Sequence, residues 1–186
     1  MCIRDSLSSE NWKRPEQELE FLMHLLQEYL IQERATLNEN NIRLQIIGRR
    51  DRIPENVQRE MDKSVEMTSQ NDGTILCLAI NYGGRAEIVD AIHKIGTKIQ
   101  DNELKPDQVT EKIVSDHLYT AGMSDPDLLI RTAGEMRISN YLLWQISYAE
   151  IWTTETMWPE FKIDDFHGAI RDYSNRRRRF GGLDKE

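Results

Sequence analysis

Residues 74–80 have the sequence TILCLAI, a continuous apolar stretch, and NYGGR follows at residues 81–85. An apolar run without alternation is typical of a strand covered on both faces, as in the parallel sheets of α/β proteins. The glycines favour a turn, and apolar residues then recur at helical spacing from Ile88 to Ile95. A buried strand, a turn and an amphipathic helix in this order predict a βα unit.

Similar elements extend to both sides of this unit. Helices are predicted from Pro15, after Pro54, from Pro106, at residues 139–149 and from residue 164. Further strands are predicted at residues 44–47, 127–132 and 151–154. Helices that alternate with short apolar strands predict an α/β fold: a single layered domain with a mostly parallel sheet flanked by helices.

Composition narrows the class of protein. The 186 residues are 39% hydrophobic and 30% charged, which excludes a disordered or collagen-like chain. The net charge of −8 argues against nucleic acid as a partner, because phosphate neutralisation needs surplus basic charge. Cys2 and Cys77 cannot build a disulfide framework. No secretory signal is visible at the start of the chain. These features predict a cytoplasmic protein.

Residues 131–140, RTAGEMRISN, are the richest segment chemically. They follow a predicted strand, where open α/β sheets bind their ligands. Arg131 and Arg137 supply two permanent cations, and Ser139 stands at the expected start of a helix, whose free amides attract anions. These groups suit a diphosphate. Taken singly, they also fit a solvated loop with Ser139 as a helix cap; position and composition together favour phosphate.

Three other features leave alternatives open. Glu150, expected at the far end of the 139–149 helix, could bind Mg²⁺ or simply face solvent. Residues 8–14 could line a polar substrate site or form an ordinary loop before a helix. The basic run at residues 176–179 could be a solvated helix end or approach an anionic ligand. NYGGR has the wrong spacing for a dinucleotide or P-loop motif.

Together, SSENWKRP, NYGGR, IRTAGEMRISNYLLWQISYAE and RRRRFGG resemble the cis-prenyltransferase family, over residues 7–182. The resemblance implies a Mg²⁺-dependent enzyme that lengthens farnesyl diphosphate with isopentenyl diphosphate. Its product would be a long-chain polyprenyl diphosphate such as undecaprenyl diphosphate, the lipid carrier of the cell wall. The resemblance also implies a homodimer that is cytoplasmic and contacts the inner membrane surface through this lipid product.

The resemblance further implies roles for the 131–150 segment. Arg131, Arg137 and Ser139 would hold the diphosphate of isopentenyl diphosphate, and Ile138 would contribute its backbone. Glu150 would be a Mg²⁺ ligand.

At the other end of the chain, Asn11 matches the position that acts in the family as proton acceptor. Because a neutral amide is a poor base, we interpret Asn11 as a residue that positions the leaving proton. The apolar faces of the first helix and of the 74–80 strand would either wall a tunnel for the growing chain or form ordinary core. The other residues that would line the substrate site are Ser8, Ser9, Glu10, Trp12 and Arg14.

One departure from the family pattern is large. The aspartate-glycine-asparagine loop that binds the allylic diphosphate in the family does not precede Leu7, and MCIRDS at residues 1–6 does not resemble it. We therefore expect an unrelated leader at residues 1–6 and a cis-prenyltransferase domain at residues 7–186 that lacks its first strands and is inactive as it stands. The alternative is a non-catalytic partner subunit or a diphosphate-binding module; the intact 131–140 motif favours the enzyme.

Overall fold

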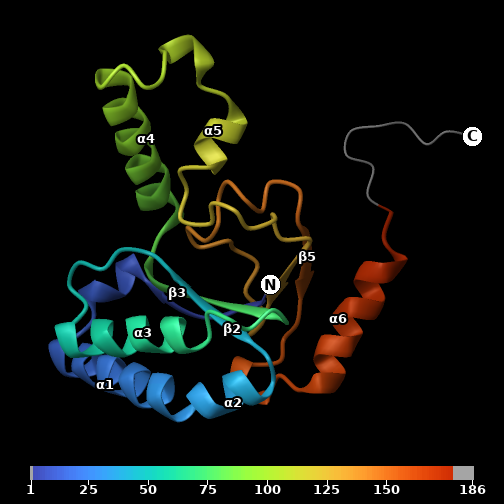
Figure 1. The fold of residues 1–186 in the computed structure, drawn as a ribbon. Coiled ribbons are helices and arrows are strands. Elements are labelled where there is room, and N and C mark those ends of the chain that lie inside the picture. The colour runs from blue at the N-terminus through green and yellow to red at the C-terminus, as the bar shows by residue number, and fades with distance from the viewer. Residues whose placement is uncertain (1, 178–186) are drawn as a thin grey trace, which may run out of the picture. The chain divides into compact units, whose positions relative to one another are not determined.

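The computed structural model describes residues 2–177, with side chains from Leu7 onward (Figure 1). The chain divides into two compact units, Met1–Gly122 and Met123–Glu186.

The first unit contains a parallel three-stranded sheet in the order β1-β3-β2. Its strands are β1 (Cys2–Ser8), β2 (Arg43–Ile47) and β3 (Ile75–Tyr82). The predicted 74–80 strand is confirmed as β3, which is buried from Cys77 onward. Its central position explains the continuous apolar run, since strands pair with it on both edges and its side chains join a buried apolar cluster formed with the helices of this unit.

The strand β1 was not predicted. The sequence pattern assigned no strand to the expected leader at residues 1–6, whereas in the structure Cys2 pairs with Leu76 and Ser6 with Ala79. Strand pairing uses backbone N–H and C=O groups, so it does not require an apolar pattern in the added strand. The neighbouring edge of β3 supplies those partners.

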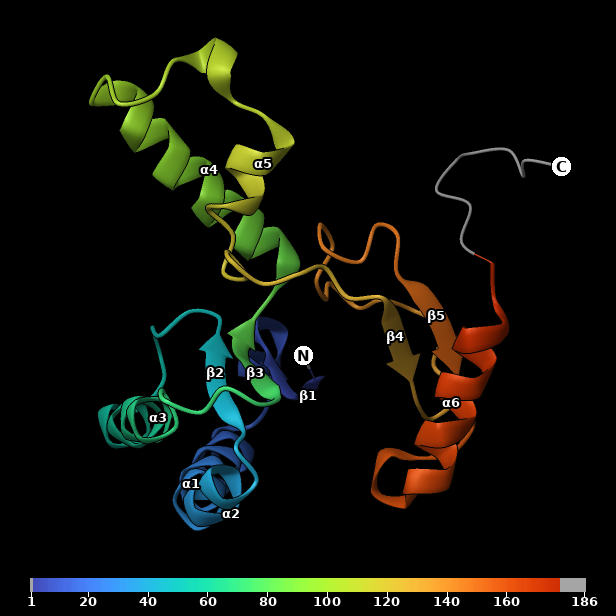
Figure 2. The same cartoon turned by 45° about the vertical axis from the view of Figure 1, so that its right-hand side comes forward.

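Helices α1 (Glu16–Gln32), α2 (Arg34–Glu39) and α3 (Glu55–Met67) lie together along the sheet (Figures 1 and 2). Pro15 and Pro54 immediately precede α1 and α3, as expected from the preference of proline for helix starts. The buried apolar cluster that these helices share with the sheet comprises Met23, Leu30, Leu37, Leu44, Ile53, Val57, Met61, Leu78 and Ile80.

The long helix α4 (Gly84–Gln100) follows β3, and the predicted helix from Pro106 is divided into η2 (Pro106–Gln108) and α5 (Glu111–Ser115). The glycines of NYGGR do not make the expected tight turn. Gly83 is extended, with φ −159°, and Gly84 already belongs to α4. The left-handed residue at this point is Asn81, with φ 51°.

The second unit holds a parallel pair of strands, β4 (Leu128–Arg131) and β5 (Glu150–Thr153), followed by η3 (Trp158–Glu160) and α6 (Ile163–Asn175). Both strands and the last helix were predicted. The mostly parallel sheet with flanking helices is confirmed for the chain.

The predicted helix at residues 139–149 is not formed; the segment is a series of turns. Ser139, Asn140 and Leu142 have φ values of 53°, 58° and 44°. Left-handed residues cannot continue a right-handed helix, because the backbone reverses its handedness at each of them. Two expectations are corrected as a result: Ser139 does not cap a helix, and Glu150 does not stand at a helix end.

Candidate functional site

The short helix η1 (Ser9–Lys13) carries the first group of predicted site residues. Ser8 precedes it: the Ser8 hydroxyl accepts a hydrogen bond from the backbone N–H of Glu10 at 3.2 Å. The backbone N–H of Ser8 donates to Oδ1 of Asn11 at 2.8 Å. Ser9 is half-buried and Glu10 is exposed. Asn11 is therefore fixed at the carboxyl end of β1, an arrangement compatible with its predicted positioning role.

Trp12 is held from two directions. Its indole Nε1–H donates to Oδ1 of Asn81 at 2.7 Å. The guanidinium of Arg52 lies 4.9 Å from the centre of the indole ring, within the range of a cation–π interaction. The ring therefore has one fixed edge and one covered face.

A groove of about 570 Å³ opens beside Trp12. Leu19, Met23 and Val57 give it an apolar floor. Its polar and charged lining residues include Arg14, Glu16, Glu20, His24, Gln27, Arg52 and Asn56. Of the predicted loop residues, Trp12 and Arg14 line this groove, whereas Ser8, Ser9, Glu10 and Asn11 do not.

Arg14 is held loosely compared with Trp12. Its Nη1 lies 2.6 Å from Oε1 of Glu18, and both side chains are about half exposed, 47% and 45%. Exposed ion pairs of this kind contribute little to stability, since water competes for both charges. The Arg14 guanidinium is thus free to exchange its partner for an anion in the groove.

The apolar faces expected to wall a tunnel are largely core. Met23 and Leu30 of α1 and Leu78 and Ile80 of β3 belong to one buried cluster. Only Met23 among these four also lines the groove. The simpler interpretation, ordinary core, accounts for the other three.

The second group of predicted residues lies in the loop after β4. Gly134, with φ 64°, permits the bend, and a Cβ added there would lie 2.6 Å from Oε2 of Glu155. The backbone N–H groups of Ala133 and Gly134 donate to the carbonyls of Thr156 and Thr154, both at 2.9 Å. These bonds tie the start of the loop to the chain that leaves β5.

Arg131 and Ser139 are brought together by this loop. Nη2 of Arg131 lies 3.5 Å from Oγ of Ser139, a long and weak contact. Nε of Arg131 is buried without a hydrogen-bond partner in the part of the chain that the structure describes. A buried donor of this kind costs free energy until an acceptor reaches it. A diphosphate oxygen is an acceptor of the appropriate charge.

Arg137 and Ile138 are more open. Arg137 pairs with Glu135, and its side chain is 70% exposed. Ile138 is 38% exposed. The ion pair of Arg137 is with Glu135, whereas the hydrogen bond in this loop joins Arg131 and Ser139. The structure therefore brings Arg131 and Ser139 together, while Arg137 lies in the same loop with a carboxylate as its partner.

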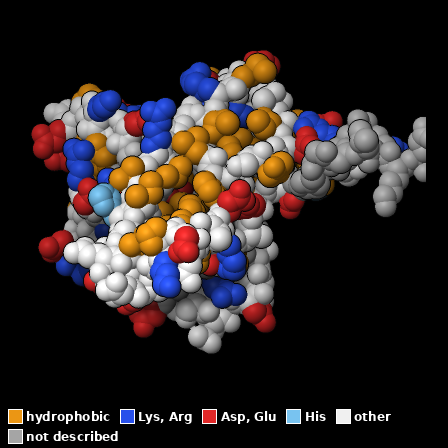
Figure 3. Space-filling model, turned by 90° about the horizontal axis from the view of Figure 1, so that it is seen from above, with side chains coloured by type: hydrophobic (Ala, Val, Ile, Leu, Met, Phe, Trp, Pro, Cys, Tyr) orange, Lys and Arg blue, Asp and Glu red, His pale blue; other side chains and the backbone are white. Residues whose placement is uncertain are grey.

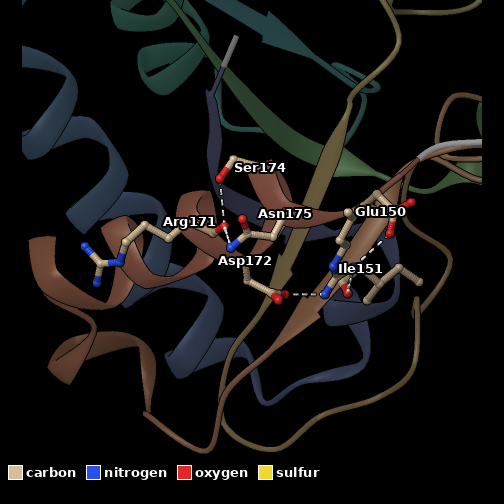
Figure 4. Close-up of polar contacts among 7 residues, drawn as sticks. Glu150, Ile151, Arg171, Asp172, Ser174 and Asn175 are labelled. Atoms are coloured by element: carbon tan, nitrogen blue, oxygen red, sulfur yellow. Dashed lines mark hydrogen bonds and ion pairs between the residues drawn. The ribbon is translucent and has the colours of Figure 1, made fainter.

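Glu150 begins β5, where its backbone N–H donates to the carbonyl of Asp127 at 2.9 Å. Figure 4 shows its carboxylate directed to the end of α6: Oε2 lies 2.8 Å from Nη1 of Arg176. Arg176 also bonds Asp172 at 2.5 Å and the carbonyl of Ile151 at 2.9 Å. Glu150 and Asp172 together raise the pKa of Arg176.

Glu150 supplies one hard oxygen group of the kind that Mg²⁺ prefers. Among the residues described, no group of three or more His, Cys, Asp or Glu side chains could hold a metal ion. A Mg²⁺ ion at Glu150 would therefore take its other ligands from substrate phosphates and water, and would compete with Arg176 for the carboxylate. Arg178 and Arg179 of the basic run lie outside the described residues.

Comparison with known proteins decides the family. Residues 6–181 match the family model described as "Putative undecaprenyl diphosphate synthase". An isoprenyl transferase of Rhodopirellula baltica is 52% identical over 177 residues, covering 95% of this chain and 72% of the relative. The chain belongs to the cis-prenyltransferase family. The family predicted from the sequence is thereby confirmed, and with it the class of enzyme, one that transfers prenyl groups.

Solved structures agree with this assignment for the cis-prenyltransferase fold. Lavandulyl diphosphate synthase from Lavandula x intermedia, in complex with dimethylallyl diphosphate, matches with a TM-score of 0.92 and 36% identity. The match covers 95% of this chain and 76% of the lavandulyl diphosphate synthase chain. A probable undecaprenyl diphosphate synthase from Campylobacter jejuni matches with a TM-score of 0.82 and 34% identity, covering 95% and 80%.

Sequence reasoning missed a polar network that joins the loop after β2 to α4. Arg49 makes two bonds to the Asp90 carboxylate, at 2.8 and 2.6 Å, and the Tyr119 hydroxyl donates to the same carboxylate. The Arg49 guanidinium lowers the pKa of Asp90, while burial and the hydrogen bond to Asp90 raise the pKa of Tyr119 to about 12. These residues join the loop after β2 to α4, and nothing in their sequence spacing indicates the contact.

Proposed function

We propose that the protein condenses isopentenyl diphosphate with an allylic diphosphate, farnesyl diphosphate, to form a long-chain polyprenyl diphosphate such as undecaprenyl diphosphate. Membership of the cis-prenyltransferase family supports a prenyl transfer. The observation that supports a diphosphate substrate is the buried Nε of Arg131, which has no acceptor among the described residues, while Nη2 of the same side chain lies near the hydroxyl of Ser139. Two arginines and one such donor suit a diphosphate better than any neutral ligand.

The proposed reaction needs positioning more than acid–base strength. The allylic carbon–oxygen bond breaks and the diphosphate leaves with the bonding electrons. The double bond of isopentenyl diphosphate attacks the allylic carbon, and the resulting cation loses a proton. Asn11, fixed by the backbone N–H of Ser8, would orient the group that takes this proton. Arg131, Arg137 and Ser139 would hold the diphosphate of the attacking substrate.

Mg²⁺ is part of this proposal, and Glu150 is the residue that would hold it together with substrate phosphates. The ion would neutralise charge on the departing diphosphate. For Glu150 to serve, Arg176 must release or share the carboxylate. Because Arg176 also bonds Asp172 and the carbonyl of Ile151, it keeps partners when Glu150 turns away.

We also propose a homodimer that is cytoplasmic and contacts the membrane surface through its lipid product. No helix in the described part of the chain is long and apolar enough to cross a membrane. Hydrophobic side chains gather on the face of the molecule drawn in Figure 3. Val89 and Ile92 of α4 are 46% and 59% exposed. Analytical ultracentrifugation with and without anionic lipid vesicles tests both associations.

The test of substrate class is calorimetric titration of isopentenyl diphosphate into the wild-type protein and into Arg131→Ala. A matched control is Arg171→Ala, because Arg171 is an exposed arginine of the same unit whose side chain points away from the Glu150 cluster (Figure 4). We expect binding that Arg131→Ala weakens and Arg171→Ala leaves unchanged. Equal affinities for all three proteins would contradict the proposal.

A diphosphate-binding module or partner subunit is a second candidate, favoured by the ion pair with Arg176 that occupies the carboxylate of Glu150. This second candidate predicts the same result in the titration with isopentenyl diphosphate, but no formation of polyprenyl product. Incubation with farnesyl diphosphate, radiolabelled isopentenyl diphosphate and Mg²⁺, followed by extraction of polyprenyl products, separates the two. Product formation establishes the enzyme.

A further inference from the structure

Asn81, the first residue of the NYGGR motif, has no role in the function proposed above. It is the next-to-last residue of β3, is only 4% exposed, and adopts the left-handed conformation with φ 51°. Asparagine tolerates this conformation better than most residues with a side chain. A left-handed residue within a buried strand costs free energy, so the surrounding contacts must compensate.

The amide nitrogen of Asn81 binds the loop that follows β2. Its Nδ2 donates to the carbonyls of Arg49 at 3.1 Å and Asp51 at 2.9 Å. The backbone N–H of Arg49 returns a bond to the carbonyl of Asn81 at 3.3 Å. Gly48 makes this approach possible, since a Cβ there would lie 2.0 Å from the carbonyl oxygen of Ile80.

The amide oxygen of Asn81 binds η1 instead. It accepts the indole N–H of Trp12 at 2.7 Å. Arg52, which covers the face of the Trp12 ring, belongs to the same loop that the Asn81 nitrogen holds. One carboxamide thus fixes the edge of the Trp12 ring directly and the cation on its face through the backbone of the loop.

We propose that Asn81 is a positioning residue that sets the orientation of Trp12 and Arg52, and thereby the shape of the groove that receives the prenyl substrate. The proposal rests on the function proposed above. It also explains the residue type: the position needs a donor and an acceptor on one short side chain, together with a left-handed backbone. Aspartate lacks the donor, and glycine keeps only the backbone.

Asn41 provides a matched control. It is a second left-handed asparagine of the same unit, with φ 54°. Its side chain also makes two bonds across loops, donating to Oδ1 of Asp72 at 2.8 Å and accepting from the backbone N–H of Asp72 at 3.1 Å. It precedes β2, at the amino end of the sheet, and does not line the groove. Asn41→Gly therefore reports the cost of losing such a side chain away from Trp12.

The experiment follows the four tryptophan indole N–H signals of the ¹⁵N-labelled chain by NMR. Trp12→Phe identifies the Trp12 signal by its loss. We expect Asn81→Gly to move that signal upfield, towards the position of an unbonded indole, and Asn41→Gly to leave it in place. Titration with farnesyl diphosphate should then give about tenfold weaker binding for Asn81→Gly than for Asn41→Gly.

Each outcome decides a separate point. A Trp12 signal that stays in place in Asn81→Gly overturns the proposal, and so does a moved signal with unchanged farnesyl diphosphate affinity. If the wild-type protein binds no prenyl diphosphate, the proposed function fails and the groove loses its assigned ligand, while the signal still shows whether Asn81 holds Trp12. If Asn81→Gly does not fold, Asn81→Asp replaces it: loss of the two donated bonds should weaken binding while Trp12 stays bonded, and unchanged affinity refutes the proposal.

Discussion

The η1 segment and the 131–140 loop carry the two halves of the predicted site, and they are held in opposite ways. In η1, Asn11 and Trp12 bond to strand ends of their own unit at 2.8 and 2.7 Å. In the loop, Arg131 reaches Ser139 at only 3.5 Å and keeps a buried nitrogen without an acceptor. The first half is preorganised by the fold, whereas the second leaves donors for a ligand to satisfy.

The largest expected effect tests how rigidly the loop after β2 is held, which Asn81 connects to Trp12 of η1. Gly48→Ala should destabilise the protein by about 3 kcal/mol or more, because the new Cβ would meet the backbone carbonyl of Ile80 at 2.0 Å and φ is 116°. Gly134→Ala should cost about 1–2 kcal/mol, since the atom it meets is the mobile carboxylate of Glu155. Urea denaturation followed by circular dichroism measures both.

Gly96→Ala is the control for this pair. Gly96 lies within α4 and has open space around it, so alanine should stabilise the helix by about 0.5–1 kcal/mol. Equal losses for Gly48→Ala and Gly134→Ala would remove the contrast in rigidity between the two loops.

The second prediction tests the arginine hydrogen-bond donors of the 131–140 loop. Arg131→Ala should weaken isopentenyl diphosphate binding by about 1.5–3 kcal/mol per lost charged hydrogen bond, tenfold or more. Binding of farnesyl diphosphate should change much less, and Arg137→Ala should behave similarly. Competitive titration with both substrates measures the two affinities. An equal loss for both would contradict the assignment of Arg131, Arg137 and Ser139 to the diphosphate of isopentenyl diphosphate.

The third prediction concerns Glu150, which pairs with Arg176 in the structure and is proposed to bind Mg²⁺. Glu150→Gln keeps the shape and removes the charge, so in a protein that also carries the family's aspartate-glycine-asparagine loop turnover should fall more than tenfold, about 1.4 kcal/mol, with partial recovery at high Mg²⁺. Stability should change by less than about 1 kcal/mol, because the pair with Arg176 is partly exposed. The measurement is initial rate against Mg²⁺ concentration. Superimposable curves would leave Glu150 as a structural partner of Arg176.

The fourth prediction uses pH to test the network that holds the loop after β2. Arg49 lowers the folded-state pKa of Asp90, so the unfolded state takes up protons more readily at this carboxyl. The stabilisation is therefore present above the ordinary aspartate pKa of about 4 and is lost as pH falls below it. Asp90→Asn should lower stability by about 1 kcal/mol at pH 7, after solvent screening, and by progressively less towards pH 3. Melting temperatures of both proteins across this range measure the difference; a gap that persists at pH 3 would contradict it.

The smallest expected effect concerns the exposed ion pair between Arg14 and Glu18. Glu18→Gln removes the exposed partner of Arg14 and should change stability by no more than about 0.5 kcal/mol. Farnesyl diphosphate affinity should rise slightly, because the Arg14 guanidinium then has no competing carboxylate. A large stability loss in a thermal melt would mean that Arg14 is fixed as firmly as Trp12.

Local patterns in the sequence were sufficient for most elements. The apolar run at 74–80 predicts β3, prolines at 15 and 54 predict the starts of α1 and α3, and apolar runs predict β4 and β5. Each depends on burial or on proline geometry within a few residues, so the chain carries the signal locally. The motifs RTAGEMRISN and SSENWKRP likewise identified the family, because they extend over adjacent residues.

The sequence by itself therefore determined the α/β class, the family and the candidate residues, since these follow from periodicity and contiguous motifs. Tertiary structure alone decided that residues 2–6 pair with β3, that residues 139–149 turn instead of forming a helix, and that Glu150 meets Arg176. It also decided that Asn81 joins Trp12 across 69 positions of sequence. Such outcomes depend on which backbone and side-chain groups remain without partners after the chain packs, and that is a property of the whole fold and not of local spacing.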